Sequence, residues 1–331
     1  MGTERPGSQI LGTGAYAPER VLTNHDLARM VDTSDEWIRE RTGINERRIA
    51  KDGETASDMA LQASRRALEA AGITAQDLDM IIVGTVTGDL PMPACAAILQ
   101  RKLGVTTIPS FDVSAACAGF IYGLSIGDQF IRTGALKRVL VVGVELLSRV
   151  LNWKDRVTCV LFGDGAGAAV LGPASDDGRG VLSTRLYTDS ALVDSLCIRA
   201  GGSQEPLTAE GLSEQRDKVF MVGSDIFKIA VKNLTSASKA ALEAGGLRAS
   251  DVNWVVPHQA NMRIITQVAM RLDIPMDRYV LNIDRYGNTS SASIPIALDE
   301  AIRDGRIQRG DTVLMCALGA GISWGSALIR V

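Results

Sequence analysis

Short apolar runs alternate along the chain with longer stretches in which apolar residues recur every three to four positions. The short runs predict strands at about 8–13, 80–86, 138–144, 166–171, 253–257, 312–317 and 324–330. The periodic stretches, bounded by capping residues and glycines, predict helices over about 34–43, 55–72, 221–244 and 289–304. Strands that alternate with helices indicate an α/β protein whose sheets are covered on both faces. Residues 187–217 break this pattern because they are polar and aperiodic, and they predict a surface excursion.

The two halves of the chain look like copies of one unit. The segment that begins Gly72-Ile-Thr-Ala-Gln-Asp-Leu-Asp matches the segment that begins Gly246-Leu-Arg-Ala-Ser-Asp-Val-Asn. Cys117 and Asn288 each lie 17 positions before a glycine that ends a predicted helix and leads into an apolar strand. These matches, at offsets of 171–174 residues, divide the chain near residue 175 and predict two α/β domains, 1–175 and 176–331.

Three polar groups occupy related places in this duplication. Extending the first match by two residues places His258 opposite Gly84, just past the end of a predicted strand. Duplicated halves face each other around a pseudo-twofold axis. The thiol of Cys117, the imidazole of His258 and the amide of Asn288 are therefore expected to meet near that axis.

Composition and charge exclude several classes of function. The 331 residues are 46% hydrophobic and 22% charged, as in a globular protein, and the net charge of −3 does not favour binding to nucleic acid. No apolar run approaches the roughly 18 residues of a membrane span. The first six residues lack an apolar signal region, so we expect a cytoplasmic protein. Five cysteines without CxxC spacing predict reduced thiols and no metal site. Outside Cys117, the cysteines are expected to pack as small hydrophobes: Cys95, Cys159, Cys197 and Cys316.

Cys117 is the candidate nucleophile. It follows a predicted strand at Ser110–Val113 and a run of small residues, and it precedes an apolar helix. The free N–H groups and the dipole of a helix N-terminus favour the thiolate, so we expect a thiol pKa below its reference value of about 8.5. A buried structural cysteine is the ordinary alternative, and the repeat favours the catalytic interpretation.

The imidazole and the amide are weaker signals when each is taken alone. His258 is one of two histidines, and it follows a strand end, the usual place for sites in α/β sheets. The other histidine, His25, stands at a polar helix start and is expected to be a surface residue. An asparagine before a helix is normally an N-cap, but the apparent equivalence of Asn288 to Cys117 argues for function.

Two glycine-rich stretches remain. The stretch Phe162-Gly-Asp-Gly-Ala-Gly-Ala-Ala-Val is not followed by a helical pattern, which disfavours a dinucleotide-binding loop and leaves tight-turn packing. The stretch Leu318-Gly-Ala-Gly-Ile-Ser-Trp-Gly lies between two strands. Its backbone N–H groups could face a developing oxyanion, although tight packing is again the alternative.

Cysteine, histidine and asparagine together suit a particular kind of chemistry. Hydrolysis by a Cys–His–acid set needs a carboxylate to support the imidazolium, and asparagine has no charge. Neutral histidine and asparagine side chains both offer N–H donors, and two donors aimed at one thioester oxygen stabilise an enolate. Loss of CO2 from a malonyl thioester requires that stabilisation, while the thiol can hold an acyl group covalently.

The sequence resembles the beta-ketoacyl-acyl-carrier-protein synthase III family from about Ile10 to Arg330. The segments that carry the resemblance begin at Asp32 (Asp-Thr-Ser-Asp-Glu-Trp-Ile-Arg-Glu-Arg-Thr-Gly-Ile), Ala115 (Ala-Ala-Cys-Ala-Gly-Phe), Phe162, Val256 (Val-Pro-His-Gln-Ala-Asn), Gly287 (Gly-Asn-Thr-Ser) and Trp324 (Trp-Gly-Ser-Ala). The resemblance implies a thiolase-like fold with duplicated halves in five α-β-α-β-α layers. It also implies a homodimer that condenses an acyl-CoA with malonyl-ACP to give 3-oxoacyl-ACP, through an acyl-Cys117 intermediate and without a metal or cofactor.

The resemblance also implies roles for individual residues. His258 and Asn288 would promote decarboxylation, and the N–H groups of Cys117 and of the turn at Ala320 would form an oxyanion hole. Further positions are implied for binding of CoA by Thr33, Trp37, Arg41, Arg156 and Asn261, for docking of acidic ACP by Lys228 and Arg263, and for the acyl pocket by Met92 and Leu318. Trp37 and Arg156 would sandwich the adenine, and Met92 would reach across the dimer into the partner's pocket.

Some positions depart from the family pattern and leave alternatives open. Leu318 replaces a common phenylalanine, Ala320 replaces a glycine, and the 187–217 segment is long. A related ketosynthase or acyltransferase of specialised, polyketide-type metabolism, using a non-acetyl group, would keep the same three residues. A non-catalytic CoA- or ACP-binding scaffold is the alternative from another class, and it would form no acyl adduct.

Overall fold

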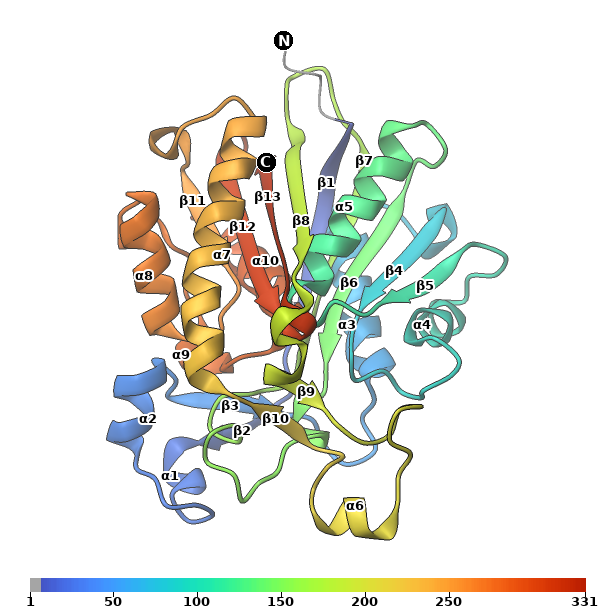
Figure 1. Cartoon of the computed structure of the whole chain (residues 1–331). Coiled ribbons are helices and arrows are strands. Elements are labelled where there is room, and N and C mark those ends of the chain that lie inside the picture. Colours follow the sequence, from blue (N-terminus) through green and yellow to red (C-terminus); the bar gives the residue numbers. More distant parts are fainter. Residues whose placement is uncertain (1–6) are drawn as a thin grey trace.

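The computed structural model describes residues 7–331 (Figure 1). The first six residues, on which the expected absence of a signal region depends, lie outside the described part of the chain. Helices in the described part are α1 (Asn24–Leu27), α2 (Asp35–Thr42), α3 (Ala56–Ala71), α4 (Cys95–Leu103), α5 (Gly119–Arg132), α6 (Ala209–Ser213), α7 (Gly223–Ala244), α8 (Met262–Leu272), α9 (Ile283–Tyr286) and α10 (Ser293–Arg303). None of the helices within residues 7–331 is long and apolar enough to span a bilayer.

Two mixed sheets form the centre of the protein, and they have the same strand order. The first sheet runs β1 (Ser8–Tyr16), β7 (Gly165–Pro173), β6 (Val139–Glu145), β4 (Met80–Gly84) and β5 (Ser110–Val113). The second sheet runs β8 (Gly180–Thr188), β13 (Ser323–Arg330), β12 (Thr312–Gly319) and β11 (Trp254–Pro257). A parallel bridge between Val255 and Tyr279 stands at the place that β5 takes in the first sheet. The α/β class and the similarity of the two halves, both predicted from the sequence, are confirmed.

Corresponding strand pairs also share their direction. In the first sheet β1 and β7 are antiparallel, β7 and β6 are antiparallel, and β6 and β4 are parallel. The second sheet repeats this pattern in β8, β13, β12 and β11. The proposed division near residue 175 falls in the connection between β7 and β8, where one sheet ends and the other begins.

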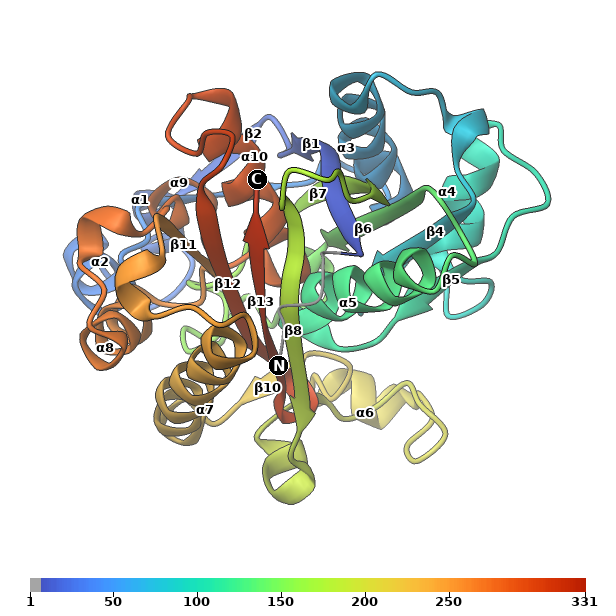
Figure 2. The same ribbon diagram turned by 90° about the horizontal axis from the view of Figure 1, so that it is seen from above.

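Helices cover both faces of each sheet and give five layers. One apolar cluster joins α3 and α4 to the outer face of the first sheet, and another joins α7 and α8 to the outer face of the second. The largest cluster contains α5 and α10, which lie between the two sheets. Viewed from above, α7 and α8 flank one side of the molecule, and α3 and α4 flank the other (Figure 2).

The local sequence explains how these elements begin and end. The Thr55 hydroxyl accepts a hydrogen bond from the Asp58 N–H, and the Asp58 carboxylate accepts one from the Thr55 N–H, which caps the start of α3. Gly72 ends the helix with φ of 66°, a left-handed conformation that suits glycine. Alternation along β12 sends Val313, Met315 and Ala317 to the central layer and the intervening residues to α7 and α8.

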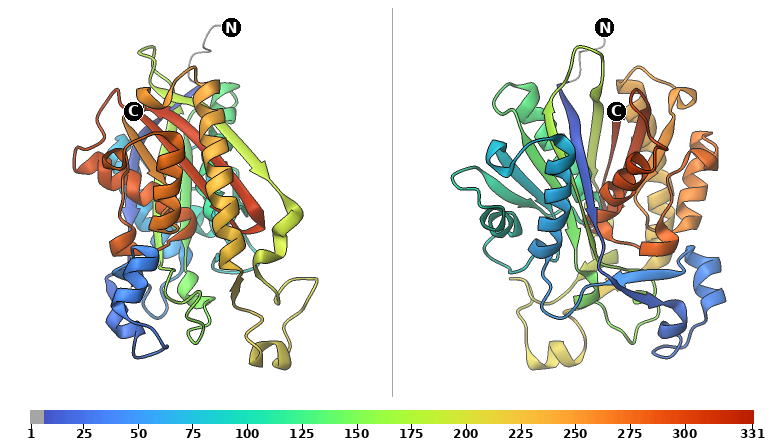
Figure 3. Two further views of the ribbon diagram at one scale, coloured as in Figure 1. Left: turned by 60° about the vertical axis from the view of Figure 1, so that its left-hand side comes forward. Right: turned by 180° about the vertical axis from the view of Figure 1, so that it is seen from behind.

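Two additions lie at the same end of the molecule (Figure 3). The first is a hairpin of β2 (Arg20–Thr23) and β3 (Glu46–Ile49) with α1 and α2 between its strands. The second pairs β9 (Leu196–Ile198) with β10 (Val219–Met221) and includes α6. The sequence predicted neither two-stranded sheet, and it did not predict β8. The aperiodic 187–217 segment therefore contains regular structure that its sequence did not predict, because the short strand β9 pairs with β10 outside the segment and has no amphipathic repeat.

Candidate active site

Two similar turns lie side by side between the sheets and open the central helices. Cys117 lies in a 3-10 turn, Ala116–Ala118, that joins β5 to α5. A second 3-10 turn, Ser290–Ala292, precedes α10. Each turn begins with a residue in the left-handed region, with φ of 44° at Ala116 and 50° at Ser290. The two turns contact each other in the tertiary structure.

The two turns show that the equivalence between Cys117 and Asn288, which the sequence suggested, is wrong. Aligned on their left-handed residues, Ala116 corresponds to Ser290, so Cys117 corresponds to Ser291 and not to Asn288. Counting back from the helix-ending glycines fails because α5 has 14 residues and α10 has 11. Asn288 lies nearby for a different reason, since it precedes the second turn and pairs with Phe162 in a parallel bridge.

Glycines at the strand ends allow the turns to approach. A Cβ on Gly84 would lie 2.6 Å from the Gly119 carbonyl carbon, and a Cβ on Gly143 would lie 2.2 Å from the Ser291 oxygen. The Ser291 hydroxyl donates a hydrogen bond of 2.6 Å to the Gly84 oxygen. Both turns therefore pack directly against the ends of β4 and β6.

The turn after β12 approaches Cys117 equally closely. A Cβ on Gly319 would lie 2.5 Å from the Cys117 nitrogen. The next residue, Ala320, faces the same cavity as Cys117 and keeps a negative φ, while Gly321 takes the left-handed conformation with φ of 69°. A negative φ at Ala320 is compatible with the expected use of its N–H group as an oxyanion donor. That role stays a prediction.

Gly319→Ala is expected to lower activity by about tenfold to a hundredfold, because a shift of about 1 Å in Cys117 misaligns the nucleophile. The measurement is kcat/KM for condensation. Gly202→Ala is the matched control, since a Cβ there meets nothing within 4 Å and the backbone φ is not positive. Equal activities of the two variants would contradict the close approach of Gly319 to Cys117.

A cavity of about 290 Å³ opens beside Cys117. Its wall is mostly apolar and comes from both halves of the chain: Val86, Ala116, Cys117, Leu147, Phe162, Leu196, Cys197, Ile198, Val219, Ser290 and Ala320. The 187–217 segment therefore supplies β9 to the wall of this cavity. Cys197 lines this cavity and is half-buried, which corrects its expected place in the core.

The two residues expected in the acyl pocket are not among the side chains that line this cavity. Leu318 does not line the cavity, because alternation along β12 turns it toward the cluster of α7 and α8. This placement corrects the prediction for Leu318. Met92 is 84% exposed, and its predicted place is the pocket of a partner subunit, so its role stays a prediction.

The surroundings of the Cys117 sulfur raise its pKa. Burial is the largest cause and raises the pKa of the thiol to about 12, and the carboxylate of Glu145 acts in the same direction. The nearby Ser290 hydroxyl acts in the opposite direction and lowers the pKa of the thiol. The expectation of a lowered thiol pKa is therefore wrong for the protein without substrate, because desolvation outweighs the stabilising contacts.

His258 is buried just after β11, and its hydrogen bonds fix its tautomer. Its Nδ1 lies 2.6 Å from the Ser293 hydroxyl oxygen, which also accepts a hydrogen bond from the Gln259 N–H. The buried hydroxyl proton of Ser293 finds its acceptor at Nδ1, which places the imidazole proton on Nε2. Burial lowers the pKa of His258 to about 3, so the ring is neutral at physiological pH.

Asn288 is held in a comparable way. Its Oδ1 accepts a hydrogen bond of 2.9 Å from the Ser290 N–H, which leaves the two Nδ2 protons available. Among the described residues, neither Asn288 Nδ2 nor His258 Nε2 has a protein partner, and neither atom is sealed from solvent. The site thus offers two oriented N–H donors on uncharged side chains.

The predicted CoA residues gather on α2 and its neighbours. Two guanidinium groups lie over the Trp37 ring, with Arg41 at 4.9 Å and Arg156 at 5.1 Å from the ring centroid. Arg156 also donates to the Asp32 oxygen. Among residues 7–331 the buried Thr33 hydroxyl has no hydrogen-bond partner, so it would have to become exposed before a phosphate oxygen could reach it. Asn261 caps α8 and donates to the Arg41 oxygen, so both atoms of its amide have partners.

The two predicted docking residues lie close to each other in space. Lys228 is exposed on α7, and Arg263 is exposed at the start of α8. The Arg263 guanidinium lies 5.7 Å from the ring centroid of Phe227, the neighbour of Lys228. These two cations therefore form one basic surface across α7 and α8.

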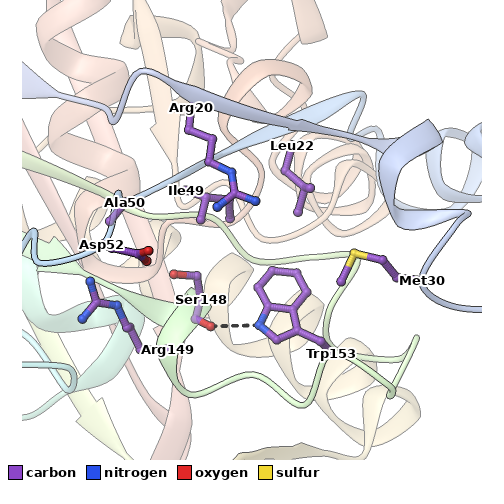
Figure 4. A pocket seen from close by; sticks show the side chains of 9 residues that line it. All are labelled: Arg20, Leu22, Met30, Ile49, Ala50, Asp52, Ser148, Arg149 and Trp153. Carbon is purple, nitrogen blue, oxygen red and sulfur yellow. Dashed lines mark hydrogen bonds between the residues drawn. The ribbon is translucent and has the colours of Figure 1, made fainter.

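A second cavity, of about 310 Å³, shares no lining residue with the first. It lies beside the β2–β3 hairpin, and Arg20, Asp52, Arg149 and Trp153 are among the side chains that line it (Figure 4). The Trp153 indole donates a hydrogen bond to the Ser148 oxygen. Within residues 7–331 no cluster of histidine, cysteine and carboxylate side chains is suited to hold a metal ion.

The sequence analysis missed three polar residues around the reacting groups: Glu145, Ser290 and Ser293. An acidic residue at the end of the apolar run 138–144 was a usable signal for Glu145, because sites lie at the ends of such strands. The serines follow Asn288 within a run of small polar residues, and nothing in that run distinguishes the three serines that contact Gly84, Glu145 and His258.

Comparisons with known proteins agree with this geometry. Models of 3-oxoacyl-[acyl-carrier-protein] synthase III match residues 111–190, and models of its C-terminal part match residues 242–331. The beta-ketoacyl-[acyl-carrier-protein] synthase III of Xanthomonas campestris pv. campestris is 52% identical over 331 residues, with 99% of each chain covered. The crystal structure of the 3-oxoacyl-[acyl-carrier-protein] synthase III of Aquifex aeolicus superposes with a TM-score of 0.90 at 46% identity, covering 98% of this chain and 100% of that one.

A further solved structure is the priming beta-ketosynthase of a polyketide biosynthetic pathway. It has a TM-score of 0.91 and 37% identity, covering 100% of this chain and 98% of that one. These similarities confirm the expected thiolase-like fold. The chain belongs to the 3-oxoacyl-[acyl-carrier-protein] synthase III family of condensing enzymes.

Proposed function

We propose that the protein condenses an acyl-CoA with malonyl-ACP, with loss of CO2, to give a 3-oxoacyl-ACP that begins fatty acid synthesis. One observation carries the proposal: two uncharged side chains, His258 and Asn288, keep free N–H donors near the turn that holds Cys117. Donors without a strong base or acid suit enolate formation better than hydrolysis. No metal or other cofactor takes part in this scheme.

In the first half-reaction Cys117 attacks the thioester carbon of acyl-CoA. The C–S bond to CoA breaks, and the acyl group stays on the sulfur as a covalent intermediate. The N–H groups of Cys117 and Ala320 are proposed to stabilise the oxyanion of the tetrahedral intermediate. The apolar cavity beside Cys117 would then hold the acyl chain.

In the second half-reaction the malonyl thioester replaces CoA. The Nε2–H of His258 and the Nδ2–H of Asn288 donate to the thioester oxygen, so the electrons released with CO2 form a stabilised enolate. The enolate carbon attacks the acyl-Cys117 carbonyl carbon and expels the thiolate. Because His258 stays neutral, it acts as a hydrogen-bond donor throughout this step and not as a base.

Binding of CoA requires a rearrangement at Trp37. A base stacked on both sides needs roughly 7 Å between the flanking planes, two van der Waals contacts of about 3.5 Å. The 5.1 Å between Arg156 and the Trp37 centroid is too short for that. Arg156 is therefore proposed to leave Asp32 when adenine binds, while the Thr33 hydroxyl and Arg41 approach the phosphates.

Charge reversal on the basic surface tests carrier docking. The variant Lys228→Glu with Arg263→Glu is expected to raise KM for malonyl-ACP by about tenfold, because two interface charges of about 1 kcal/mol or less each become repulsive. Malonyl-pantetheine, which lacks the acidic protein, should be used equally well by both forms. Lys239→Glu is the control, since this exposed lysine lies about 16 Å further along α7. An unchanged KM for malonyl-ACP in the double variant would contradict docking at this surface.

A homodimer is proposed because Met92 is an exposed apolar side chain that would complete the partner's acyl pocket. Met92→Trp is expected to narrow that pocket and to lower kcat/KM for longer acyl-CoAs more than for acetyl-CoA. The measurement is a set of kcat/KM values across chain lengths, together with the molar mass in solution. Equal effects at every chain length would count against the assignment of Met92.

A second candidate function is priming in specialised, polyketide-type metabolism with a non-acetyl acyl group. It is favoured by the similarity to the polyketide priming ketosynthase. It is also favoured by the long 187–217 segment, which contributes β9 to the wall of the cavity beside Cys117. One experiment separates the candidates. A panel of acyl-CoAs is incubated with malonyl-ACP in the conditions of the cytoplasm, the proposed location, and products are identified by mass. Failure to form 3-oxoacyl-ACP from any acyl-CoA would overturn both.

A further inference from the structure

Glu145 is a buried carboxylate at the carboxyl end of β6 that the reaction scheme above does not use. Its side chain is fully buried, and within residues 7–331 it forms no ion pair. It accepts hydrogen bonds from the Val86 N–H and from the hydroxyls of Thr85, Thr87 and Ser290. A buried carboxylate held only by neutral donors is costly, which suggests a role beyond packing.

Ser290 connects this carboxylate to the nucleophile. Its hydroxyl donates to Glu145 Oε1 at 3.2 Å and is close enough to the Cys117 thiol to lower the pKa of that thiol. Ser290 and Cys117 line the same cavity. Ser290 takes a left-handed φ of 50° in the turn that contacts the turn of Cys117.

The electrostatics of the pair favour proton sharing. Burial raises the pKa of Glu145 to about 7, and the Glu145 charge in turn raises the pKa of Cys117. A thiolate beside an ionised carboxylate would put two negative charges into one buried site. Moving the thiol proton to the carboxylate keeps the net charge of the site at minus one, and so avoids that cost.

Other groups near Glu145 do not compete for this proton. The neighbouring loop after β4 presents Thr85, Val86 and Thr87, and the turn before α10 presents Ser290, none of which titrates near neutral pH. Cys117 is the titratable group on the remaining neighbour, the turn before α5. His258 is a poor proton acceptor, because its Nδ1 already accepts from Ser293 and burial disfavours the imidazolium.

We propose that Glu145 receives the Cys117 proton through the Ser290 hydroxyl when Cys117 is acylated. The S–H proton passes to the Ser290 oxygen as the Ser290 proton passes to Glu145 Oε1, and the sulfur electron pair forms the bond to the acyl carbon. CoA leaves as a thiolate with the electrons of the broken C–S bond. The proton on Glu145 then passes back through Ser290 to the CoA sulfur. Glu145 acts through Ser290 and does not itself touch the substrate. This inference rests on the proposed function.

The test measures acylation alone, as the rate at which Cys117 gains an acetyl group from acetyl-CoA at a series of pH values. The carboxylate can accept a proton only when ionised. The wild-type rate should therefore rise with pH through about 7, the pKa of Glu145, and then level off. In Glu145→Gln the rate should fall by about a hundredfold, the usual loss for a removed proton acceptor, and this acid limb should disappear.

Two further variants separate the relay from simple packing. Ser290→Ala keeps Glu145 and the backbone N–H that holds Asn288, but it should lose the same acid limb. Thr87→Val removes a donor to the ionised carboxylate without touching Ser290, so the limb should move to higher pH while the plateau rate remains. Malonyl-ACP decarboxylation, which does not use the thiol proton, checks that the site of each variant is intact.

Two results would overturn the relay: an acid limb that survives in Glu145→Gln, or a loss of decarboxylation in that variant as large as its loss of acylation. The second result would indicate a structural role for the carboxylate. A wild-type protein that gains no acetyl group on Cys117 at any pH would overturn the proposed function instead. If the wild-type protein is acylated and both Glu145→Gln and Ser290→Ala keep the same rise of rate with pH, the relay is contradicted and the proposed function is not.

Discussion

Cys117→Ala is expected to abolish condensation and to leave the protein unable to gain the mass of an acyl group from acyl-CoA. The physical reason is that the reaction has no covalent intermediate without the sulfur, and the rest of the cavity wall is mostly apolar. Loss of a nucleophile in such sites costs on the order of 10³–10⁶ in kcat. The measurement is the intact mass of the protein after mixing with acetyl-CoA, followed by peptide mapping.

The second thiol of the cavity supplies the control for this result. Cys197 lines the same cavity as Cys117 but lies on the strand β9 and not before the N-terminus of a helix. Cys197→Ser should therefore still gain one acyl group per chain. An adduct that persists in Cys117→Ala and vanishes in Cys197→Ser would reverse the assignment of the nucleophile. The absence of any adduct in the wild-type protein would favour a non-catalytic scaffold.

Removing either donor to the enolate is the second large expected effect. His258→Ala and Asn288→Asp should each lower malonyl-ACP decarboxylation by about 10²–10³, the typical loss for one donor to a developing oxyanion. Asn288→Asp keeps the size of the side chain but replaces the N–H donor with a repelling charge. Acylation of Cys117 should be affected much less, because the oxyanion of that step is proposed to face Cys117 and Ala320.

The pH dependence of decarboxylation follows from the neutral imidazole. Because the pKa of His258 is lowered to about 3, the ring keeps its neutral form as the pH falls from about 8 to about 5. The rate should therefore stay flat in this window. His25→Ala is the control, since the other histidine is exposed on α1 and should leave the rate unchanged. A titration near pH 6.5 that disappears in His258→Ala would contradict the buried neutral state.

Local sequence signals predicted much of the fold correctly. The predicted boundaries of the helix from Thr55 to Gly72 match α3 because capping hydrogen bonds and a left-handed glycine act within a few residues of each other. The strand predicted at Ser110–Val113 matches β5 at both ends. Short strands such as β9 and β10 escaped prediction, because three residues that pair with a distant partner have no periodicity of their own.

The sequence predicted candidate residues for the site, but it did not predict how they are arranged in space. Strand-end position identified His258, and the small residues around Cys117 marked a close approach that Gly319 confirms. The equivalence drawn between Cys117 and Asn288 was wrong, because a count along the chain assumes helices of equal length. The expected depression of the Cys117 pKa was also wrong, since burial cannot be seen in a linear pattern.

The sequence by itself determined the α/β class, the duplicated halves and the three candidate reacting side chains, because these follow from periodicity, capping and residue type over short distances. Only the tertiary structure decided which N–H of His258 is free, which residues line the acyl cavity and which carboxylate lies behind Cys117. Those properties depend on contacts between segments far apart in the chain, such as Ser293 with His258 and Ser290 with Glu145. Hydrogen-bond direction and desolvation are set by such contacts, and the order of residues does not encode them locally.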